Sequence, residues 1–227
     1  PEQIQRIVDL GATEICNVYG LTEGYGNSVV GDCKAPLQQR LHASGRPLDG
    51  VSIRIVDGET GAVLPQGKVG EIKISGRMTP GYWNAPDLTA DSMTADGWFR
   101  TGDLGMLDEA GWLRFRGRLK ELMKTGGINV SPAEVEEALL RHPAVASCFV
   151  TGLPDPKLDQ MVAAVVILED GAEATGEALQ SFCREQIAPY KLPRRWCFAT
   201  PGDLPLTSTG KLQRNRLWEL FEPPAKI

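Results

Sequence analysis

The segment from Gly50 to Gly117 constrains the fold most, because short runs of alternating apolar and polar residues are separated there by turn sequences. Strands are expected at residues 51–56, 71–75, 106–107 and 112–115. Aspartate and glycine fill the intervening turns, as in Asp57-Gly58 and Asp108-Glu109-Ala110-Gly111. This pattern predicts a small β-rich barrel or sandwich, with one or two helical turns at 87–94.

The residues before this segment have a different pattern. Ile4, Ile7 and Val8 lie at helical spacing and Gly11 follows them, so a short helix is expected at residues 2–10. Residues 14–19 are expected to form a strand. A helix and one strand without an earlier pairing partner are unusual at the start of a domain. We therefore expect residues 1–117 to be the C-terminal remainder of a large α/β domain.

After Gly117 the pattern predicts a second, compact α+β unit at residues 118–227. Strands are expected at 119–123, 145–150 and 162–168, and helices from 131, at 177–187 and after 211. Ser131-Pro132-Ala133-Glu134 combines a capping box with a proline at the first helical position. The start of that helix is therefore the most clearly marked boundary in the sequence.

Composition excludes several classes of function. A net charge of −5 argues against a nucleic-acid partner, because a phosphate footprint needs clustered Lys and Arg. Five cysteines without a C-x-x-C pair indicate neither a disulfide framework nor a zinc site, and they fit a cytoplasmic location. The longest apolar run, residues 161–168, is about half of a membrane span. With only His42 and His142, a Ser-His-Asp or histidine-rich metal site is not expected.

Tyr19-Gly20-Leu21-Thr22-Glu23 lies at the end of an expected strand, which is where sheets of α/β domains bind ligands. An aromatic ring, a hydroxyl and a carboxylate within five residues could stack a base and hold a metal-bound phosphate. A glycine turn beside a buried tyrosine explains these five residues equally well. The pentapeptide alone leaves both interpretations open.

Residues 99–105 place Asp103 between two glycines, in Phe-Arg-Thr-Gly-Asp-Leu-Gly. A short carboxylate could project there from a tight turn and accept two hydrogen bonds from a ribose diol. A plain β-turn is the alternative for this string alone.

Four basic residues follow at alternate positions and so are expected on one face of a strand: Arg114, Arg116, Arg118 and Lys120. A solvated edge strand, protected from aggregation by its charge, is the simpler interpretation of Arg114 and Arg116.

Two loops in the second unit carry further candidates. In Thr125-Gly126-Gly127-Ile128, the paired glycines would let a ligand or a second backbone approach closely, although glycine pairs are common in loops. The segment 205–211 ends in Gly210-Lys211 but is not a Walker loop, because Pro205 stands where that loop has its first glycine. A lone loop lysine is usually a solvated charge. The basic cluster at 191–195 is left unassigned, a surface patch being the simpler explanation.

In this order and spacing, Tyr-Gly-Leu-Thr-Glu, the segments around Asp103 and Arg118, and Pro-Leu-Thr-Ser-Thr-Gly-Lys resemble the adenylate-forming acyl-CoA synthetases of the AMP-binding (ANL) superfamily. The resemblance covers nearly the whole chain, but the phosphate-binding loop of that family, rich in Ser, Thr and Gly, is not in this sequence. It implies the end of a large α/β N-terminal domain with a barrel-like subdomain, followed by a mobile α+β lid.

The resemblance also implies roles for individual residues. In the first part of the chain, it implies that Tyr19 packs on adenine, with Gly20 in the same nucleotide site. Thr22 would contact the α-phosphate, and Glu23 would bind Mg²⁺. Asp103 would bind the ribose hydroxyls.

Further along the chain, the resemblance implies that Arg118 reaches the nucleotide and that Lys120 is the hinge of the lid. Gly126 and Gly127 would line the tunnel through which the pantetheine arm of CoA reaches the acyl-adenylate. Lys211 would bridge the substrate carboxylate and the α-phosphate during adenylation.

The implied reaction joins a carboxylic acid, fatty acyl or aryl, to the AMP part of ATP with release of pyrophosphate, and then transfers the acyl group to coenzyme A with release of AMP. The small residues at 24–27 hint at room for an elongated acyl chain. Two alternatives stay open: a carrier-protein adenylation domain of the peptide synthetase type, and a non-catalytic relative of the fold. Because the upstream part of such an enzyme is not in this sequence, the chain alone is expected to be inactive. A homodimer is left open.

Overall fold

The computed structural model describes residues 2–221, and the chain forms two compact units, 1–120 and 121–227. The division falls between Lys120 and Glu121, a little beyond the boundary expected after Gly117. Each unit has its own β-structure and its own hydrophobic core. No helix in the described part is long and apolar enough to span a bilayer.

The first unit begins with helix α1 (Glu2–Asp9) and a three-stranded antiparallel sheet. Its strands are β1 (Val18–Leu21), β2 (Gly26–Val30) and β3 (Arg46–Pro47), with helix α2 (Leu37–His42) between the last two. The strand expected at 14–19 starts only at Val18. Pairing with β2 defines it, from Val18 opposite Val30 to Leu21 opposite Gly26, and this partner cannot be identified from residues 14–19 alone.

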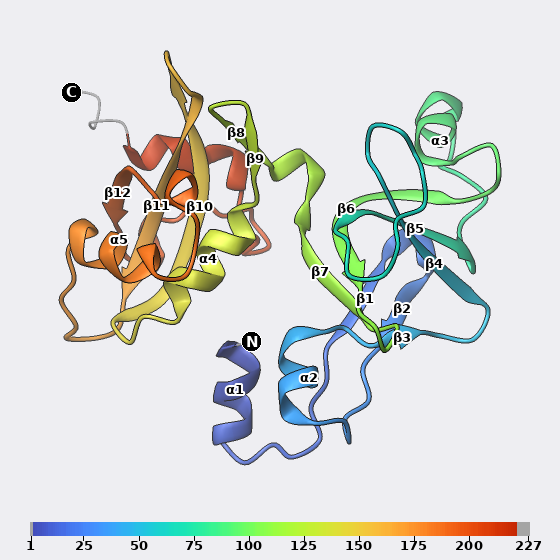
Figure 1. Cartoon of the computed structure of the whole chain (residues 1–227), viewed down its shortest axis with the longest axis horizontal. Coiled ribbons are helices and arrows are strands. Elements are labelled where there is room, and N and C mark those ends of the chain that lie inside the picture. Colours follow the sequence, from blue (N-terminus) through green and yellow to red (C-terminus); the bar gives the residue numbers. More distant parts are fainter. Residues whose placement is uncertain (1, 222–227) are drawn as a thin grey trace. The chain divides into compact units, whose positions relative to one another are not determined.

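A second sheet is an antiparallel meander in the order β4-β5-β6-β7 (Figure 1). Its strands are β4 (Val51–Val56), β5 (Gly70–Gly76), β6 (Phe99–Leu107) and β7 (Leu113–Arg118), and helix α3 (Pro86–Ser92) precedes β6. Within the described residues the outer strands β4 and β7 do not pair, so the sheet is not a closed barrel. One apolar cluster joins the two sheets of this unit, and its buried members are Tyr19, Val29, Ile55, Ile72, Ile74 and Leu113.

Strand β6 differs from its prediction, because the tight turn expected around Asp103 is part of the strand. Residues 101–103 form a bulge opposite the single residue Ile72 of β5. Gly102 adopts a φ of 68°, which is a left-handed conformation that glycine accepts without steric cost. Thr101 fixes the bulge by donating from Oγ1 to the Ile72 carbonyl, over 2.7 Å.

The prediction of a strand at 119–123 is also wrong. Strand β7 ends at Arg118, and a 3₁₀ helix, η2 (Leu119–Glu121), follows. Lys120 therefore does not continue the alternation of basic residues along the strand. Arg114 is not a simple solvated charge either, because its Nε lies 3.2 Å from Asp108 Oδ2.

The described part of the second unit, up to Phe221, is a sheet with two α-helices. Strands β8 (Met123–Thr125), β9 (Ile128–Val130), β10 (Val145–Asp155) and β11 (Asp159–Leu168) follow the order β10-β11-β8-β9. Strand β12 (Arg195–Phe198) pairs with β11 in parallel. The helices are α4 (Pro132–Leu140) and α5 (Gly176–Arg184), and short 3₁₀ turns lie at Pro189–Lys191 and Pro201–Asp203.

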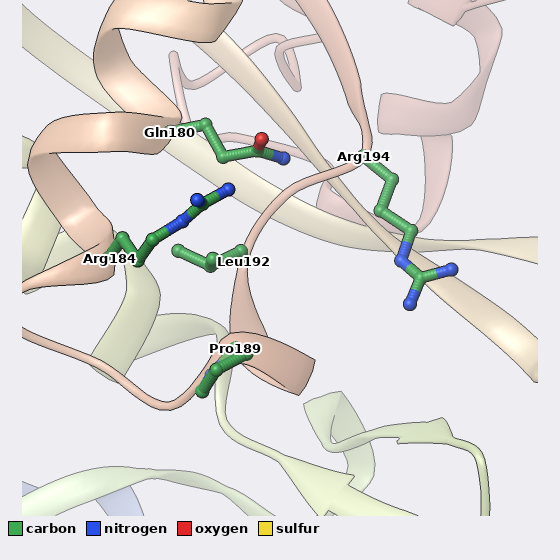
Figure 2. Close-up of a pocket in the computed structure, with 5 residues that line it drawn as sticks. All are labelled: Gln180, Arg184, Pro189, Leu192 and Arg194. Carbon is green, nitrogen blue, oxygen red and sulfur yellow. The ribbon is translucent and has the colours of Figure 1, made fainter.

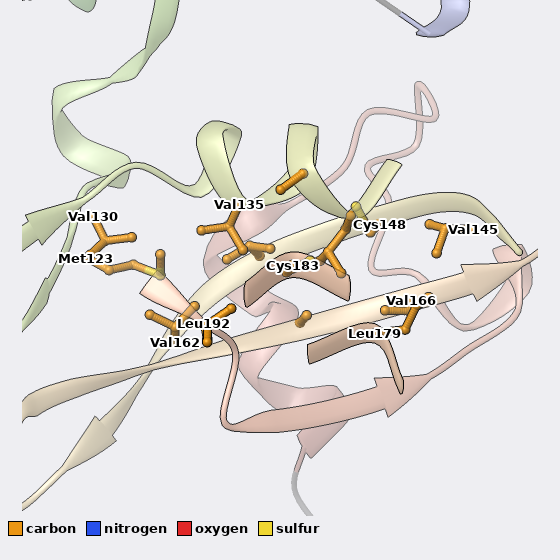
Figure 3. Packing of buried hydrophobic residues seen from close by; sticks show 14 residues of the cluster. Met123, Val130, Val135, Val145, Cys148, Val162, Val166, Leu179, Cys183 and Leu192 are labelled. Atoms are coloured by element: carbon orange, nitrogen blue, oxygen red, sulfur yellow. The ribbon is translucent and has the colours of Figure 1, made fainter. Parts of the chain in front are cut away.

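The core of this unit lies between the sheet and helices α4 and α5 (Figure 3). Alternate residues of β11 contribute to it, and Val162, Ala164 and Val166 are all at most 1% exposed. Ala163 and Val165, on the opposite face of β11, are fully buried as well. A long 3₁₀ segment, η5 (Arg214–Phe221), lies against β10 and β12. Buried on both faces, β11 is the centre of the second unit.

Helix α4 begins at Pro132, as predicted, with Ser131 at the N-cap. The predicted capping box is wrong, because Ser131 makes no side-chain capping bond and Glu134 instead accepts a hydrogen bond from Lys191 Nζ. An ammonium from another part of the chain thus takes the carboxylate that would complete the box. The helix expected after Lys211 is the 3₁₀ segment η5 rather than an α-helix.

Candidate functional site

A pocket of about 520 Å³ in the first unit collects most of the candidate residues. It is formed where β1 ends, where β6 bulges and where β7 passes into η2. The candidates that line it are Gly20, Thr22, Glu23, Asp103, Arg118 and Lys120. Residues separated by up to a hundred positions in the sequence thus meet at one site.

Tyr19 is not among the residues that line this pocket, but it is hydrogen-bonded to Asp103, which is. Its hydroxyl donates a hydrogen bond of 2.8 Å to Asp103 Oδ2. The residue is 8% exposed and its ring packs near Phe115, with 6.1 Å between centroids. Burial, and secondly the charge of Asp103, raise the pKa of the phenol, so it stays protonated and donates. The structure therefore shows Tyr19 as a support for Asp103, and its packing on adenine stays a prediction.

Asp103 is a largely buried carboxylate with a partner at each oxygen. Arg118, its cross-strand neighbour, places Nε 3.4 Å from Asp103 Oδ1. Burial raises the pKa of this carboxyl, while the Tyr19 hydrogen bond and the charges of Arg118 and Lys120 oppose the rise. A carboxylate has about four lone-pair positions. Asp103 could therefore still accept hydrogen bonds from a ligand diol in the pocket.

Glu23 is held by a residue that the sequence did not single out. Tyr82 donates from its hydroxyl to Glu23 Oε1 over 2.6 Å, and it also lines the pocket. This hydrogen bond is the main cause of the raised pKa of the Tyr82 phenol. The backbone of Glu23 is fixed too, since its carbonyl accepts from Thr79 N over 2.7 Å. No local pattern around Tyr82 reveals its partner, 59 positions earlier in the sequence.

Glu23 alone would not make a metal site. Among the described residues there is no group of three or more His, Cys, Asp or Glu side chains that could hold an ion. Mg²⁺ is commonly held by one or two carboxylates together with substrate phosphates and water. Glu23, whose carboxylate lines the pocket of about 520 Å³, fits that arrangement if most ligands come from outside the protein.

Gly20 has a structural reason to be glycine. A Cβ at this position would lie 1.9 Å from the carbonyl oxygen of Gly26 in the paired strand β2. No side chain can relieve a contact with backbone at that distance. Gly20 therefore allows the close approach of β1 and β2, whatever it also does for a ligand.

In the second unit, Lys211 is exposed and ends a small, internally bonded loop. Thr207 N donates to the Lys211 carbonyl over 2.8 Å, and Lys211 N donates to Thr207 Oγ1 over 3.0 Å. Leu206 and Leu212 form an isolated bridge at the base of this loop. The loop thus presents the lysine to solvent on a defined backbone.

Gly126 and Gly127 form the two-residue turn that joins β8 to β9, between the paired residues Thr125 and Ile128. Their φ values are 56° and 80°, as a type I′ hairpin turn requires. Gly126 N also donates to the Leu158 carbonyl over 2.8 Å. A Cβ on Gly127 would meet nothing within 4 Å, so the space beside it is open to a ligand.

A second cavity, of about 360 Å³, lies beside α5 and is lined by Gln180, Arg184, Pro189, Leu192 and Arg194 (Figure 2). Figure 2 shows the Arg184 side chain extending toward Gln180, whereas Arg194 extends away from it. Lys191, from the same basic cluster, is paired with Glu134. These positive charges do not converge on one point, so the cluster stays unassigned.

Comparison with known proteins identifies the family. Residues 1–83 match the AMP-binding enzyme family, and residues 134–211 match the AMP-binding enzyme C-terminal domain. This chain belongs to the AMP-binding enzyme family. The resemblance inferred from the motifs is thereby confirmed, as is the mixed α/β fold class.

Three similar proteins illustrate the family. The sulfoacetate–CoA ligase of Cupriavidus necator is 41% identical over 183 residues, covering 80% of this chain and 35% of the relative. The fatty acid–[acyl-carrier-protein] ligase ScoC of Streptomyces coeruleorubidus is 38% identical over 215 residues, covering 92% and 40%. ATP-bound MatB from Rhodopseudomonas palustris matches with a TM-score of 0.81 at 36% identity, covering 92% and 41%. This AMP-binding enzyme chain thus spans 35–41% of their lengths.

The pairing of Tyr19 with Asp103 predicts a pH-dependent loss of stability in Tyr19→Phe. Without its hydroxyl donor, the buried carboxylate becomes costlier to keep charged, by about 1–3 kcal/mol of unfolding free energy. The loss should be largest at neutral pH and shrink as pH falls through the Asp103 pKa, because the protonated carboxyl needs this donor less. Denaturant unfolding of the natural full-length AMP-binding enzyme measures it.

Tyr25→Phe is the matched control, because Tyr25 is 72% exposed. It should change the unfolding free energy by less than about 0.5 kcal/mol at any pH. Equal losses in the two variants, or a loss in Tyr19→Phe that does not depend on pH, would contradict the role of the hydroxyl in stabilising a charged Asp103.

If the pocket binds Mg·ATP, the contact between Tyr82 and Glu23 predicts that Tyr82→Phe weakens that binding about 2- to 10-fold, the value of one ordinary hydrogen bond. Glu23 would lose the donor that restricts its rotamer. Affinity for AMP without Mg²⁺ should stay unchanged. Calorimetric titration of both ligands measures the difference, and an equal weakening for both would show that Tyr82 shapes the pocket instead.

Proposed function

We propose that this chain forms part of an AMP-forming acid–thiol ligase, which activates a carboxylic acid with ATP and transfers the acyl group to coenzyme A. The observation that carries the proposal is the convergence of Thr22, Glu23, Asp103 and Arg118 on one pocket. Membership of the AMP-binding enzyme family supports it. So does the similarity to a sulfoacetate–CoA ligase and to ATP-bound MatB.

The pocket of the first unit would bind the nucleotide. The remaining lone pairs of Asp103 would accept from the ribose hydroxyls, and Tyr19 would keep that carboxylate in place. The exposed guanidinium of Arg118, already beside Asp103, would reach the nucleotide. The hydroxyl of Thr22 would contact the α-phosphate. Gly20, which lines the same pocket, would contact the nucleotide through its backbone.

Glu23 would hold Mg²⁺ together with phosphate oxygens and water. The hydrogen bond from Tyr82 supports this role, because it orients the Glu23 carboxylate at the pocket. When bound, this ion would offset negative charge on the phosphates. Lys120 and Arg118 supply positive charge at the same pocket from the protein itself.

In the first half-reaction, a carboxylate oxygen of the acid attacks the α-phosphorus of ATP. The bond between that phosphorus and the bridging oxygen to the β-phosphate breaks, and pyrophosphate leaves with the electron pair. Lys211 would donate to the carboxylate and the α-phosphate as negative charge develops there. A compact ammonium with three donors suits that position.

In the second half-reaction, the thiol sulfur of coenzyme A attacks the acyl carbonyl, AMP leaves, and the thiol proton passes to solvent. The β8–β9 turn with Gly126 and Gly127 would face the pantetheine arm, and the open space beside Gly127 supports this assignment. Rotation about Lys120 would exchange the Lys211 loop for this turn. The division of the chain immediately after Lys120 supports a hinge there.

The acyl acceptor and the acid have alternatives. Similarity to ScoC, an acyl-carrier-protein ligase, favours keeping a carrier-protein thiol as the second candidate acceptor. A fatty acyl or aryl acid is our proposal for the substrate, and a small acid such as that of the sulfoacetate–CoA ligase is the alternative.

The five cysteines, all in the described part, form no disulfide, which supports a cytoplasmic location.

Acid-dependent exchange of pyrophosphate into ATP tests the first half-reaction. We expect the natural full-length protein to catalyse exchange with at least one member of a panel of fatty acyl, aryl and short anionic acids. Lys211→Ala should lower that exchange by about 100-fold or more, because the charge that offsets the developing anion is lost.

Lys68→Ala is the control for this test, because Lys68 is also an exposed lysine but lies in the first unit, away from the pocket residues. It should exchange normally. Exchange by Lys211→Ala at the normal rate would remove the assigned role of Lys211. The absence of exchange with any acid would favour a non-catalytic relative of the fold.

The β8–β9 turn gives a separate test of the second half-reaction. Gly127→Asn should preserve the fold, because asparagine tolerates the left-handed conformation that this turn requires. If the pantetheine arm passes this turn, the added side chain should slow acyl transfer from preformed acyl-adenylate to CoA about 10-fold or more, with pyrophosphate exchange unchanged. Unchanged transfer would mean that Gly127 serves only the turn.

A further inference from the structure

Arg214 lies three positions after Lys211, at the start of η5, and forms a two-pronged ion pair with Glu136. Its Nη1 and Nη2 donate to Glu136 Oε1 and Oε2 over 2.7 and 3.0 Å. Such a fork fixes orientation as well as distance, which a single ammonium cannot do. The pair therefore sets the direction in which the chain leaves the Lys211 loop.

Glu136 is a well-fixed acceptor. Its carboxylate is 12% exposed and projects from helix α4, whose apolar face is packed into the core of the second unit. Glu136 Oε1 also accepts from Val150 N of β10 over 2.8 Å. The carboxylate is thus held by a helix and a strand that both belong to the rigid part of the unit.

Gln213 connects this pair to the loop. Its backbone N donates to the Pro205 carbonyl over 2.8 Å, and its Nε2 donates to the Leu206 carbonyl over 2.9 Å. Gln213 therefore closes the base of the loop that ends in Lys211, and the next residue is Arg214. The hydrogen bonds inside the loop define its conformation, whereas Arg214 connects the loop to helix α4.

The same guanidinium also lies near Glu121, with 3.7 Å between Arg214 Nε and Glu121 Oε2. Glu121 is the first residue of the second unit and follows Lys120, the proposed hinge. One side chain thus joins the Lys211 loop to the core of its unit and to the point where that unit begins.

We infer that Arg214, through Glu136, is a positioning residue that holds the Lys211 loop in the geometry needed for adenylation. The inference rests on the proposed function of Lys211. Arg214 would contribute no atom to the reaction. It would keep the loop at a fixed place on α4, so that movement of the second unit carries Lys211 as part of a rigid body.

The two half-reactions separate this role from a merely structural one, because only adenylation would use Lys211. In the natural full-length protein, Arg214→Lys keeps the charge but loses the fork, and Glu136→Gln keeps an acceptor for Val150 N. Each should lower pyrophosphate exchange about 10- to 100-fold, the effect of a displacement near 1 Å. Acyl transfer from preformed acyl-adenylate to CoA should change less than about twofold, which also shows that the variants are folded.

Arg216→Lys is a matched control on the same element. Arg216 also makes a two-pronged pair, from Nε and Nη2 to the two carboxylate oxygens of Glu219 over 2.7 and 2.8 Å, but this pair is exposed and does not reach α4. Both half-reactions should be unchanged in this variant. Hydrogen exchange adds a second measurement: amides of residues 205–213 should exchange faster in Arg214→Lys and Glu136→Gln than in Arg216→Lys.

The outcomes distinguish the inference from the function on which it rests. If Lys211→Ala abolishes exchange while Arg214→Lys and Glu136→Gln exchange normally, the positioning role fails and the proposed function stands. Equal losses in both half-reactions would also overturn the positioning role, because they would indicate general destabilisation. If Lys211→Ala itself exchanges normally, the role of Lys211 fails and the inference fails with it.

Discussion

The buried carboxylate of Asp103 is the constraint on which the candidate nucleotide site depends. Burial raises its pKa, and a charged carboxylate at this depth is stable only because Tyr19 and Arg118 each contact one of its oxygens. These partners come from β1 and β7, so two sheets must be in register before the site exists. The bulge at Gly102 places the carboxylate among them, which makes the site a product of the whole first unit rather than of one motif.

The candidate residue of the second unit, Lys211, differs from Asp103 because it is exposed while its backbone is held by hydrogen bonds. Lys211 stands on a loop whose hydrogen bonds are internal or to Gln213, and Arg214, three positions later, reaches helix α4. The fork between Arg214 and Glu136 supplies that attachment outside the loop, so Lys211 can be accessible without its backbone being free. The exposed cation on a defined backbone is what the proposed role of Lys211 in a single step would require.

The sequence predicts the elements whose signals are local. Strand β4 (Val51–Val56) coincides with its prediction because alternation and an Asp-Gly turn define it, and α4 begins where Ser131-Pro132 indicates. Prediction from the sequence fails where a residue far away in the chain determines the local structure. The bulge that places Asp103 inside β6 depends on Ile72, and the capping box fails because Lys191 binds Glu134. Tyr82 could not be predicted as a partner of Glu23, because no spacing links the two residues.

The two glycine motifs show why a match to a family pattern does not by itself identify a ligand contact. At Gly20 the protein alone requires glycine, since a Cβ would lie 1.9 Å from the Gly26 carbonyl. At Gly127 the turn requires only a left-handed backbone, and the space around a Cβ is open. Asparagine can meet the backbone requirement at Gly127, whereas no side chain fits at Gly20. Of these two glycines, Gly127 can therefore be substituted without disturbing the fold, whereas Gly20 cannot. An effect on a ligand can be separated from an effect on structure at Gly127.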